Sequence, residues 1–454
     1  MTSRLAQPRG RFRAIAAAKL DDLHAQAALD GATGRLYGLR TQAWEELGDV
    51  EALRERAREI RARTMAGLEE HVGTFTRAVE ARGGRVHRAA TAAEACAAVV
   101  DICRAAGART AAKSKSMAAE EIGLNEALEE AGVTVVETDL GEYILQLAGE
   151  PPVHIVAPAI EKTASEVAEL FSRAEGAPVA PELGELTRTA RRRLRETFLT
   201  ADVGITGVNF GVAETGSVCL VTNEGNGRLV SAVPRAHVAI MGIERVVPTL
   251  AELAVLLRLL ARSATGQRLT SYTTLLTGPR RAGETDGPEE LHVVLLDNGR
   301  TRLLESRYRE MLHCIRCGAC LNVCPIYRKA GGGAYGPVYS GPMGAVLAPL
   351  LAGLERAPDL PHASSLCGAC TAACPVKIPL HELLLELRAD RPAPLAERLG
   401  FVLWSLAWSR PAGYRASSAL ARWTRPLAGL LGPGRAWAAG RAIPPLARRR
   451  FRDR

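Results

Sequence analysis

The feature that most constrains this 454-residue chain is a cysteine pattern that occurs twice, fifty residues apart. The first group has the spacing C-x2-C-x2-C-x3-C-P and consists of Cys314, Cys317, Cys320 and Cys324. The second group matches its last three positions and consists of Cys367, Cys370 and Cys374, again followed by proline. Seven of the ten cysteines lie in these groups, so the pattern predicts metal ligands and not scattered core thiols.

This spacing is the one that bacterial ferredoxins use, where three thiolates hold one iron–sulfur cluster and the fourth reaches a second cluster. By that exchange, we predict that cluster 1, a [4Fe–4S] centre, is held by Cys314, Cys317, Cys320 and Cys374. Cluster 2 is held by Cys324, Cys367 and Cys370. The position matched to Cys314 is Ser364, so cluster 2 is either a [3Fe–4S] centre or a [4Fe–4S] centre with a non-cysteine fourth ligand.

Zinc is the alternative metal. Structural zinc sites take four ligands, usually from two separated C-x2-C pairs, and a repeated run of close thiols before proline fits that arrangement poorly. The three cysteines outside the repeat, Cys96, Cys103 and Cys219, have apolar neighbours and are predicted to be small core residues.

Four segments follow along the chain. Residues 1–85 are predicted to be helical, 306–390 hold the cysteines, and 391–454 form a tail rich in Arg and Trp. In 86–305, short β-rich runs alternate with helical ones, which predicts an α/β domain with a largely parallel sheet. The expected strands are 133–138, 153–158, 217–222, 237–243 and 291–297, and the expected helices include 165–174 and 251–264. A helix is also expected within 331–355, which favours a helical ferredoxin-like module.

Two stretches of the α/β segment, 113–125 and 201–228, are dense in glycine and polar residues, so they are candidates for a ligand pocket. The candidate contacts are Lys113 or Lys115 for an anion, together with Glu214, Asn223, Glu224 and Asn226. The competing interpretation is that these glycines form turns and the lysines are solvated. No phosphate-loop or dinucleotide motif is present. The histidines beside apolar runs, His154, His237 and His292, are predicted to be structural.

The chain resembles the iron–sulfur lactate utilization protein B family along nearly its whole length. The resemblance is carried by KSKSM (113–117), EIGLN (121–125), ETDLGEYI (137–144), ADVGITGVNF (201–210), AETGS (213–217), NEGNGR (223–228), DNGR (297–300) and the two cysteine motifs, 314–325 and 366–382. It implies an α/β domain similar to the ribose-phosphate isomerase and CoA-transferase group, followed by a helical two-cluster module. Ser364 looks like a family trait, whereas Glu161 stands where we expect a family histidine.

The resemblance also implies a function: carrying electrons in the oxidation of L-lactate to pyruvate. It implies two partners, a second cysteine-rich iron–sulfur protein and a smaller protein sharing the α/β domain. Two other hypotheses stay open. In one, the α/β pocket itself binds and oxidises a 2-hydroxy acid, or handles an acyl ligand, and the clusters take up the electrons. In the other, the chain is a scaffold with structural clusters. None of these three hypotheses assigns a catalytic residue.

The net charge of +9 comes from the tail, which carries +11 against −2 for the rest of the chain and holds four of the five tryptophans. A segment rich in arginine and tryptophan suits contact with an anionic membrane or with an acidic partner. Membrane contact would place the chain on the side of a quinone acceptor. A solvated extension is the alternative, and no nucleic-acid recognition module accompanies the charge. We find no secretion signal and no apolar run of about 20 residues. The expected location is cytoplasmic, with peripheral membrane contact through 391–454 as an option.

Overall fold

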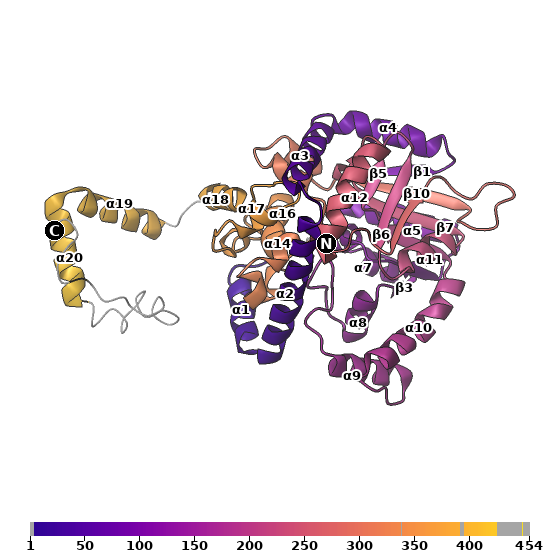
Figure 1. The fold of residues 1–454 in the computed structure, drawn as a ribbon, viewed down its shortest axis with the longest axis horizontal. Helices are drawn as coiled ribbons and strands as arrows, with labels where there is room; N and C mark the ends of the chain where they lie inside the picture. Colours follow the sequence, from indigo (N-terminus) through magenta and orange to yellow (C-terminus); the bar gives the residue numbers. More distant parts are fainter. Residues whose placement is uncertain (1–3, 337, 391–394, 425–446, 448–454) are drawn as a thin grey trace. The chain divides into compact units, whose positions relative to one another are not determined.

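The computed structural model describes residues 4–336, 338–390, 395–424 and 447. The chain divides into two compact units, one that ends at Asp390 and one formed by the residues after it (Figure 1). The domain boundaries predicted at residues 85 and 305 lie within the first unit and stay predictions.

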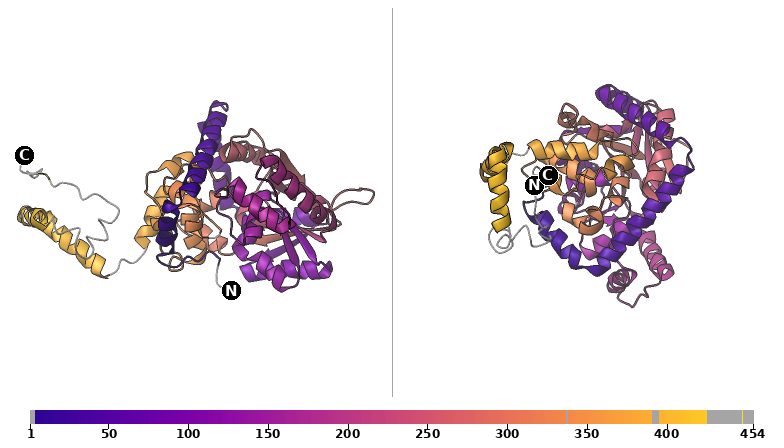
Figure 2. Two further views of the ribbon diagram at one scale, coloured as in Figure 1. Left: turned by 90° about the horizontal axis from the view of Figure 1, so that it is seen from below. Right: turned by 60° about the vertical axis from the view of Figure 1, so that its left-hand side comes forward.

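Four helices begin the first unit, in the segment expected to be helical: α1 (Arg11–Asp21), α2 (Leu23–Glu45), α3 (Val50–Ala66) and α4 (Leu68–Glu80). The carboxylates of Asp22 and Asp49 cap α2 and α3 by accepting a backbone N–H from the first turn. Both helices pack on α12 (Leu250–Thr265), and α1 and α2 also pack on α15 (Tyr327–Ala330). The N-terminal helices therefore join the α/β part to the cysteine-rich part, and in Figure 2 they run beside both.

The centre of the first unit is a six-stranded sheet in which every neighbouring pair of strands is parallel, which confirms the predicted α/β fold. In spatial order the strands are β1 (Arg85–Ala89), β10 (Glu290–Leu296), β7 (Ala236–Gly242), β4 (Val203–Gly207), β2 (Thr110–Lys113) and β3 (Thr134–Glu137). Strand β7 is buried at every position, as expected for a central strand covered on both faces. The carboxyl ends of the strands meet at one edge, where open α/β sheets bind ligands.

Helices surround this sheet. On one face, α5, α6 and α7 bury Val99, Ile122 and Leu124 in a core with Val238 and Ile205 of the central strands. The helices of the α/β part other than α12 are α5 (Ala92–Ala105), α6 (Met117–Ile122), α7 (Leu124–Glu130), α8 (Leu140–Ala148), α9 (Ala164–Glu175), α10 (Leu183–Thr200), α11 (Asn226–Ala232), η1 (Ile243–Arg245) and α13 (Arg300–Leu304).

A second, four-stranded sheet lies beside the first. Its spatial order is β8 (Val246–Val247), β5 (Phe210–Val212), β6 (Ser217–Thr222) and β9 (Tyr272–Leu276). The predicted strand 217–222 is β6, but it runs antiparallel to both of its neighbours. Helices α3, α4 and α12 contact this sheet.

The predicted strand at 153–158 is wrong, because the segment is a loop. Pro151 and Pro152 precede it and remove two backbone N–H donors. The His154 imidazole accepts the backbone N–H groups of Val156 and Ala157 at 3.0 Å, which bends the chain on itself. The loop instead contacts the cysteine-rich module, where the Tyr327 and Ser340 hydroxyls donate to its Val153 carbonyl.

The cysteine-rich module is helical, as predicted, and shares one hydrophobic core with the second sheet and the N-terminal helices. Besides α15, its elements are η2 (Arg309–His313), α14 (Ala319–Asn322), η3 (Gly333–Tyr335), α16 (Gly341–Ala352), η4 (Leu360–His362), α17 (Ala369–Ala373) and α18 (Leu380–Asp390). The helix expected within 331–355 is α16. Since the core is continuous, the module is fixed against the α/β part and is not tethered to it by a linker.

In the second unit the structure describes two packed helices, α19 (Leu395–Ser409) and α20 (Pro411–Thr424). Both expose large apolar side chains, among them Phe401, Trp404, Trp408, Leu420 and Trp423. None of the described helices is both long and apolar enough to cross a membrane. Trp437 and most of the tail arginines lie outside the described residues.

Candidate functional site

The seven cysteines of the repeat come together in the module as two neighbouring groups of thiols. A small apolar cavity is lined by four of them: Cys314, Cys317, Cys320 and Cys374. Burial raises the pKa of Cys317 to about 12, with further contributions from Cys374 and Cys314. Burial also raises the pKa of Cys370 to about 11, and there the interacting thiols are Cys324 and Cys367. These contacts follow the ferredoxin exchange in part, because Cys320 interacts with Cys314, Cys317 and Cys374 but also with Cys370. Among the described residues, no group of three or more His, Cys, Asp or Glu side chains is arranged to hold a metal ion, so both ligand sets stay predictions.

The backbone repeats along with the cysteines. Arg316 and Leu366 occupy matched positions and are both left-handed, with φ of 59° and 57°. Gly318 and Gly368 follow with φ of 76° and 80°. Because bulky residues adopt a positive φ only under constraint, the coincidence shows that both halves form the same tight turn. The Arg316 N–H donates to Cys314 Sγ at 3.4 Å, and in such turns peptide N–H groups face the sulfurs.

Ser364 takes the place of the missing thiol in this turn. The Leu366 N–H donates to Ser364 Oγ at 3.1 Å, as the Arg316 N–H does to Cys314 Sγ. The Ser364 carbonyl accepts from Arg388 at 2.7 Å. The matched Cys314 carbonyl accepts from Arg245 at 2.8 Å. The hydroxyl thus points where a fourth thiolate would point.

The two thiol groups differ in their access to solvent. Among the four thiols that line the small cavity, which we call the first thiol group, Cys317, Cys320 and Cys374 are buried and Cys314 is partly buried. Among the other three, which we call the second thiol group, Cys324 and Cys370 are buried, whereas Cys367 is exposed. The Ala369 N–H and the Ser365 hydroxyl lower the pKa of Cys367, which favours the thiolate. Buried thiols with peptide N–H groups aimed at them fit iron–sulfur clusters. The exposed thiol, Cys367, belongs to the set predicted for cluster 2.

Arginines cap the backbone carbonyls around the first thiol group, and sequence reasoning missed them. Arg61 of α3 is fully buried and donates to four carbonyls, including those of Leu312 and His313. Arg40 donates to the Ala373 carbonyl, and Arg54 donates to the Cys374 carbonyl at 2.8 Å. One feature of the sequence could have pointed to them: Arg54 and Arg61 are seven residues apart, a spacing that places both on one face of α3.

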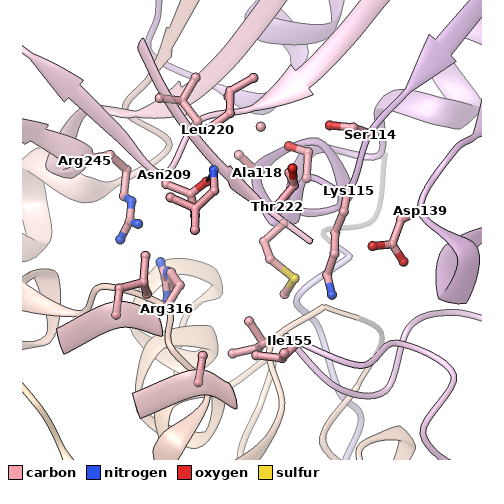
Figure 3. Close-up of a pocket in the computed structure, with 18 of the residues that line it drawn as sticks. Ser114, Lys115, Ala118, Asp139, Ile155, Asn209, Leu220, Thr222, Arg245 and Arg316 are labelled. Atoms are coloured by element: carbon pink, nitrogen blue, oxygen red, sulfur yellow. Dashed lines mark hydrogen bonds between the residues drawn. The ribbon is translucent and has the colours of Figure 1, made fainter. Parts of the chain in front are cut away.

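A cavity of about 290 Å³ lies at the carboxyl edge of the parallel sheet. Its walls come from the segments after β2, β3, β4 and β7, from the second sheet, from α12, and from the module. In Figure 3, Arg245 and Arg316 lie on one side of the cavity, and Lys115 and Asp139 lie on the other. Its size is near the lower end for small-molecule sites, and it combines apolar walls with a few charged groups.

The predicted pocket residues have mixed outcomes. Lys115, Asn223, Glu224 and Asn226 line the cavity, but Lys113 and Glu214 do not. The wholly buried Lys113 ammonium is bound to Glu137 at 2.6 Å and to Glu120 at 3.1 Å. Glu214 instead accepts the backbone N–H of Leu250 at the start of α12. Lys113 is therefore unavailable to a ligand, whereas Glu214 is exposed but lies outside the cavity wall.

The residues predicted to be structural have partners or lie in the core. His154 binds Asn322, His237 binds Thr206, and His292 binds His87. The thiols outside the repeat, Cys96, Cys103 and Cys219, are buried. Glu161 pairs with Lys19 of α1 at 2.8 Å and accepts the Gly332 N–H, so it anchors the N-terminal helix to the module.

A buried ion-pair network connects the α/β part to the module at this cavity. Arg300 binds both oxygens of Glu121, at 2.9 and 2.8 Å, and one oxygen of Glu244 at 2.6 Å. The Tyr339 hydroxyl of the module donates to Glu121 at 2.5 Å. Burial alone would raise the pKa of Glu244, but the guanidiniums of Arg300 and Arg316 lower it to about 2. Both glutamates are therefore ionised and depend on Arg300.

Comparison with known proteins gives two matching family models. A LUD domain model matches residues 72–296, and a 4Fe-4S dicluster domain model matches residues 310–378. A protein of Bacillus velezensis named Lactate utilization protein B is 49% identical over 447 residues, covering 96% of this chain and 94% of that protein. One of the same name from Bacillus thuringiensis is 47% identical with the same coverage. A crystal structure of a DUF162 family protein from Deinococcus radiodurans aligns with 52% of this chain and 98% of its own chain, at 16% identity. Its TM-score of 0.26 is too low for a comparison of the two folds.

Proposed function

The chain belongs to the lactate utilization protein B family, and from that membership we propose that it is the electron-transfer component of a system that oxidises L-lactate to pyruvate. Membership gives a role in lactate utilization and in iron–sulfur electron transfer. Beyond that role, we propose the reaction itself, the presence of two clusters and the residues that hold each cluster. When bound, such clusters supply one-electron redox chemistry. Cluster 1 is held by Cys314, Cys317, Cys320 and Cys374, and cluster 2 by Cys324, Cys367 and Cys370.

The observation that carries the proposal is the doubled turn with its two groups of thiols. Oxidation of lactate to pyruvate releases two electrons and two protons, and two one-electron centres together accept both electrons. The N-terminal helices, through Arg40, Arg54 and Arg61, hold the backbone of the first group from one side. Since the exposed thiol, Cys367, belongs to the second group, that group faces the outside of the first unit.

The partners in this proposal are a second cysteine-rich iron–sulfur protein and a smaller protein with the same α/β domain. The test is to mix the anaerobically purified holoprotein with L-lactate, alone and with both partners, and to follow cluster reduction by visible absorption and EPR. We expect reduction only when the partners are present. Clusters that keep one redox state throughout turnover would refute the electron-transfer role and favour a scaffold.

One observation favours a second candidate function, in which the α/β pocket itself binds and oxidises the 2-hydroxy acid. The 290 Å³ cavity and the small cavity of the first thiol group share Ile155 and Arg316 in their walls. A ligand in the larger cavity would therefore lie beside cluster 1. Reduction of the clusters by L-lactate in the isolated holoprotein would favour this candidate over the carrier.

We expect that Ser364→Cys changes the type of cluster 2. Ser364 Oγ accepts the Leu366 N–H, just as Cys314 Sγ accepts the Arg316 N–H in the matched turn. A thiolate at position 364 therefore fits without moving the backbone. If the native centre has three iron atoms, the variant binds one additional iron per chain, measured by iron content and by loss of the [3Fe–4S] EPR signal. If the native centre has four iron atoms, the iron content is unchanged and the EPR spectrum of cluster 2 shifts. Identical spectra and iron content would show that position 364 does not face the cluster.

We further propose that the tail makes peripheral contact with an anionic membrane. The exposed tryptophans of α19 and α20 support this, because indole rings favour the interface between lipid and water. Trp404 and Trp408 are adjacent, with ring centroids 5.6 Å apart.

Deleting residues 391–454 is expected to abolish sedimentation with anionic liposomes and to leave both clusters in place, because the first unit has its own core. Zwitterionic liposomes serve as the control and should bind the full chain more weakly, since arginine is attracted to anionic headgroups. If liposome binding and assembly with the partners both survive the deletion, the tail is only an extension.

A further inference from the structure

Arg316 takes part in two sites at once. It lies between the first two cysteines of the repeat, and its backbone N–H donates to Cys314 Sγ. Its side chain lines the 290 Å³ cavity, where Figure 3 shows it beside Arg245 and opposite Lys115. Arg316 is therefore the residue through which a ligand in the cavity and a cluster on the thiols would influence each other.

The other two guanidiniums at the cavity are already occupied. Arg300 is saturated by Glu121 and Glu244. Arg245 donates to the carbonyls of Cys314 and Ile315, which fixes the turn of the first thiol group.

Arg316 has weaker partners. Its closest carboxylate oxygen, on Glu244, is 3.4 Å away, and its other polar contact is the Met343 sulfur at 3.0 Å. The guanidinium carbon lies 4.6 Å from the centroid of the Tyr339 ring, which covers one face. Nη1 and Nη2 each use one N–H on these partners and each keep a second N–H donor. Across the cavity, Lys115 forms no hydrogen bond or ion pair with the described part of the chain.

The charges and shape of the cavity favour a small organic anion. Four cations and three carboxylates line it, and Glu244 is held by Arg300. The remaining N–H donors on the two terminal nitrogens of Arg316 match the two oxygens of a carboxylate, while Leu220, Ile240 and Leu260 offer an apolar wall for a carbon skeleton. The volume suits a molecule of a few carbon atoms better than a nucleotide.

We propose that this cavity binds a small 2-oxo or 2-hydroxy carboxylate against Arg316, and that Arg316 couples its binding to the reduction potential of cluster 1. The inference rests on the proposed function for the presence of cluster 1. Reduction adds one negative charge to a site next to the bound anion, so the anion binds the oxidised protein more tightly. By linkage, the anion must lower the potential of cluster 1 to the same degree.

The repeat provides the variant that tests this coupling. Leu366 occupies the matched position with nearly the same φ and donates the same N–H bond, so the turn does not need a guanidinium. Arg316→Leu should therefore fold and bind both clusters. A matched control is Arg54→Leu, which removes another guanidinium from the first thiol group but does not touch the cavity.

The experiment is a potentiometric EPR titration of the full-length holoprotein at constant ionic strength, with and without pyruvate, which cannot donate electrons to the clusters. We expect tenfold weaker pyruvate binding to the reduced protein, which corresponds to a fall of about 59 mV in the cluster 1 midpoint for one electron. Cluster 2 should not shift. Arg316→Leu should abolish the pyruvate effect, whereas Arg54→Leu should change the starting potential and keep the effect.

The outcomes separate this inference from the proposed function. If the partners reduce the clusters with lactate but pyruvate leaves cluster 1 unchanged, the inference is wrong and the electron-transfer role stands. A pyruvate effect that persists in Arg316→Leu overturns the role of Arg316. A larger shift with inorganic phosphate than with pyruvate overturns the carboxylate assignment. Holoprotein without redox-active clusters refutes the proposed function itself.

Discussion

Replacing Cys374 with alanine should remove cluster 1, although Cys374 belongs to the second cysteine group. Its thiol lines the small cavity together with Cys314, Cys317 and Cys320, which lie more than fifty residues earlier in the chain. Burial raises the pKa of Cys374 to about 11, so without a metal this thiol is neutral, and binding releases its proton. Loss of one of four thiolates leaves cluster 1 incomplete while cluster 2 keeps its three.

The reciprocal variant is Cys324→Ala. Cys324 belongs to the first cysteine group of the sequence, and its replacement should remove cluster 2. Iron content in either variant should fall by about half, since each cluster binds three or four iron atoms. EPR of the reduced proteins identifies which signal is lost. Cys219→Ala is the control, because this buried thiol of β6 lies outside both groups and should leave both signals intact. If Cys374→Ala instead loses the signal that Cys367→Ala loses, each cysteine group holds its own cluster and the exchange is wrong.

The repeated turn could be predicted from the sequence for a physical reason. Ligand spacing in a tight turn is a local property, so a repeat of the spacing predicts a repeat of the turn, and Arg316 and Leu366 indeed share one backbone conformation. The parallel sheet was also predictable, because its strands are continuous apolar runs such as β7.

The incorrect predictions concern contacts between segments that are distant in the sequence. Lys113 is a candidate ligand contact in the sequence because it lies in the polar, glycine-containing stretch 113–125. Its carboxylate partner Glu137 is known only once β2 and β3 are paired, since Lys113 and Glu137 are opposite each other in that register. The loop at 153–158 is apolar like a strand, but its apolar surface faces the module and not a sheet neighbour.

Arg300→Ala should destabilise the first unit by about 3–5 kcal/mol, because it leaves two buried carboxylates without their main counter-charge. The Arg300 side chain is 2% exposed, and its partners Glu121 and Glu244 are 0% and 3% exposed. Glu121 loses both guanidinium bonds and keeps only Asn298 and Tyr339 as donors. The measurement is the unfolding temperature of the holoprotein, with iron content determined on the same samples.

Two comparisons make the Arg300 result specific. Arg63→Ala breaks the exposed pair with Glu252 and should cost no more than about 1 kcal/mol. Replacing both Arg300 and Glu121 with methionine should recover part of the lost stability, because the uncompensated charge on Glu121 is removed with its partner. Because Tyr339 binds Glu121 across the boundary between the α/β part and the module, Arg300→Ala should also loosen the module and lower cluster occupancy. An unfolding temperature that matches that of Arg63→Ala would mean that Arg245 and Arg316 already neutralise this network, and that the two parts are held together by their shared apolar core alone.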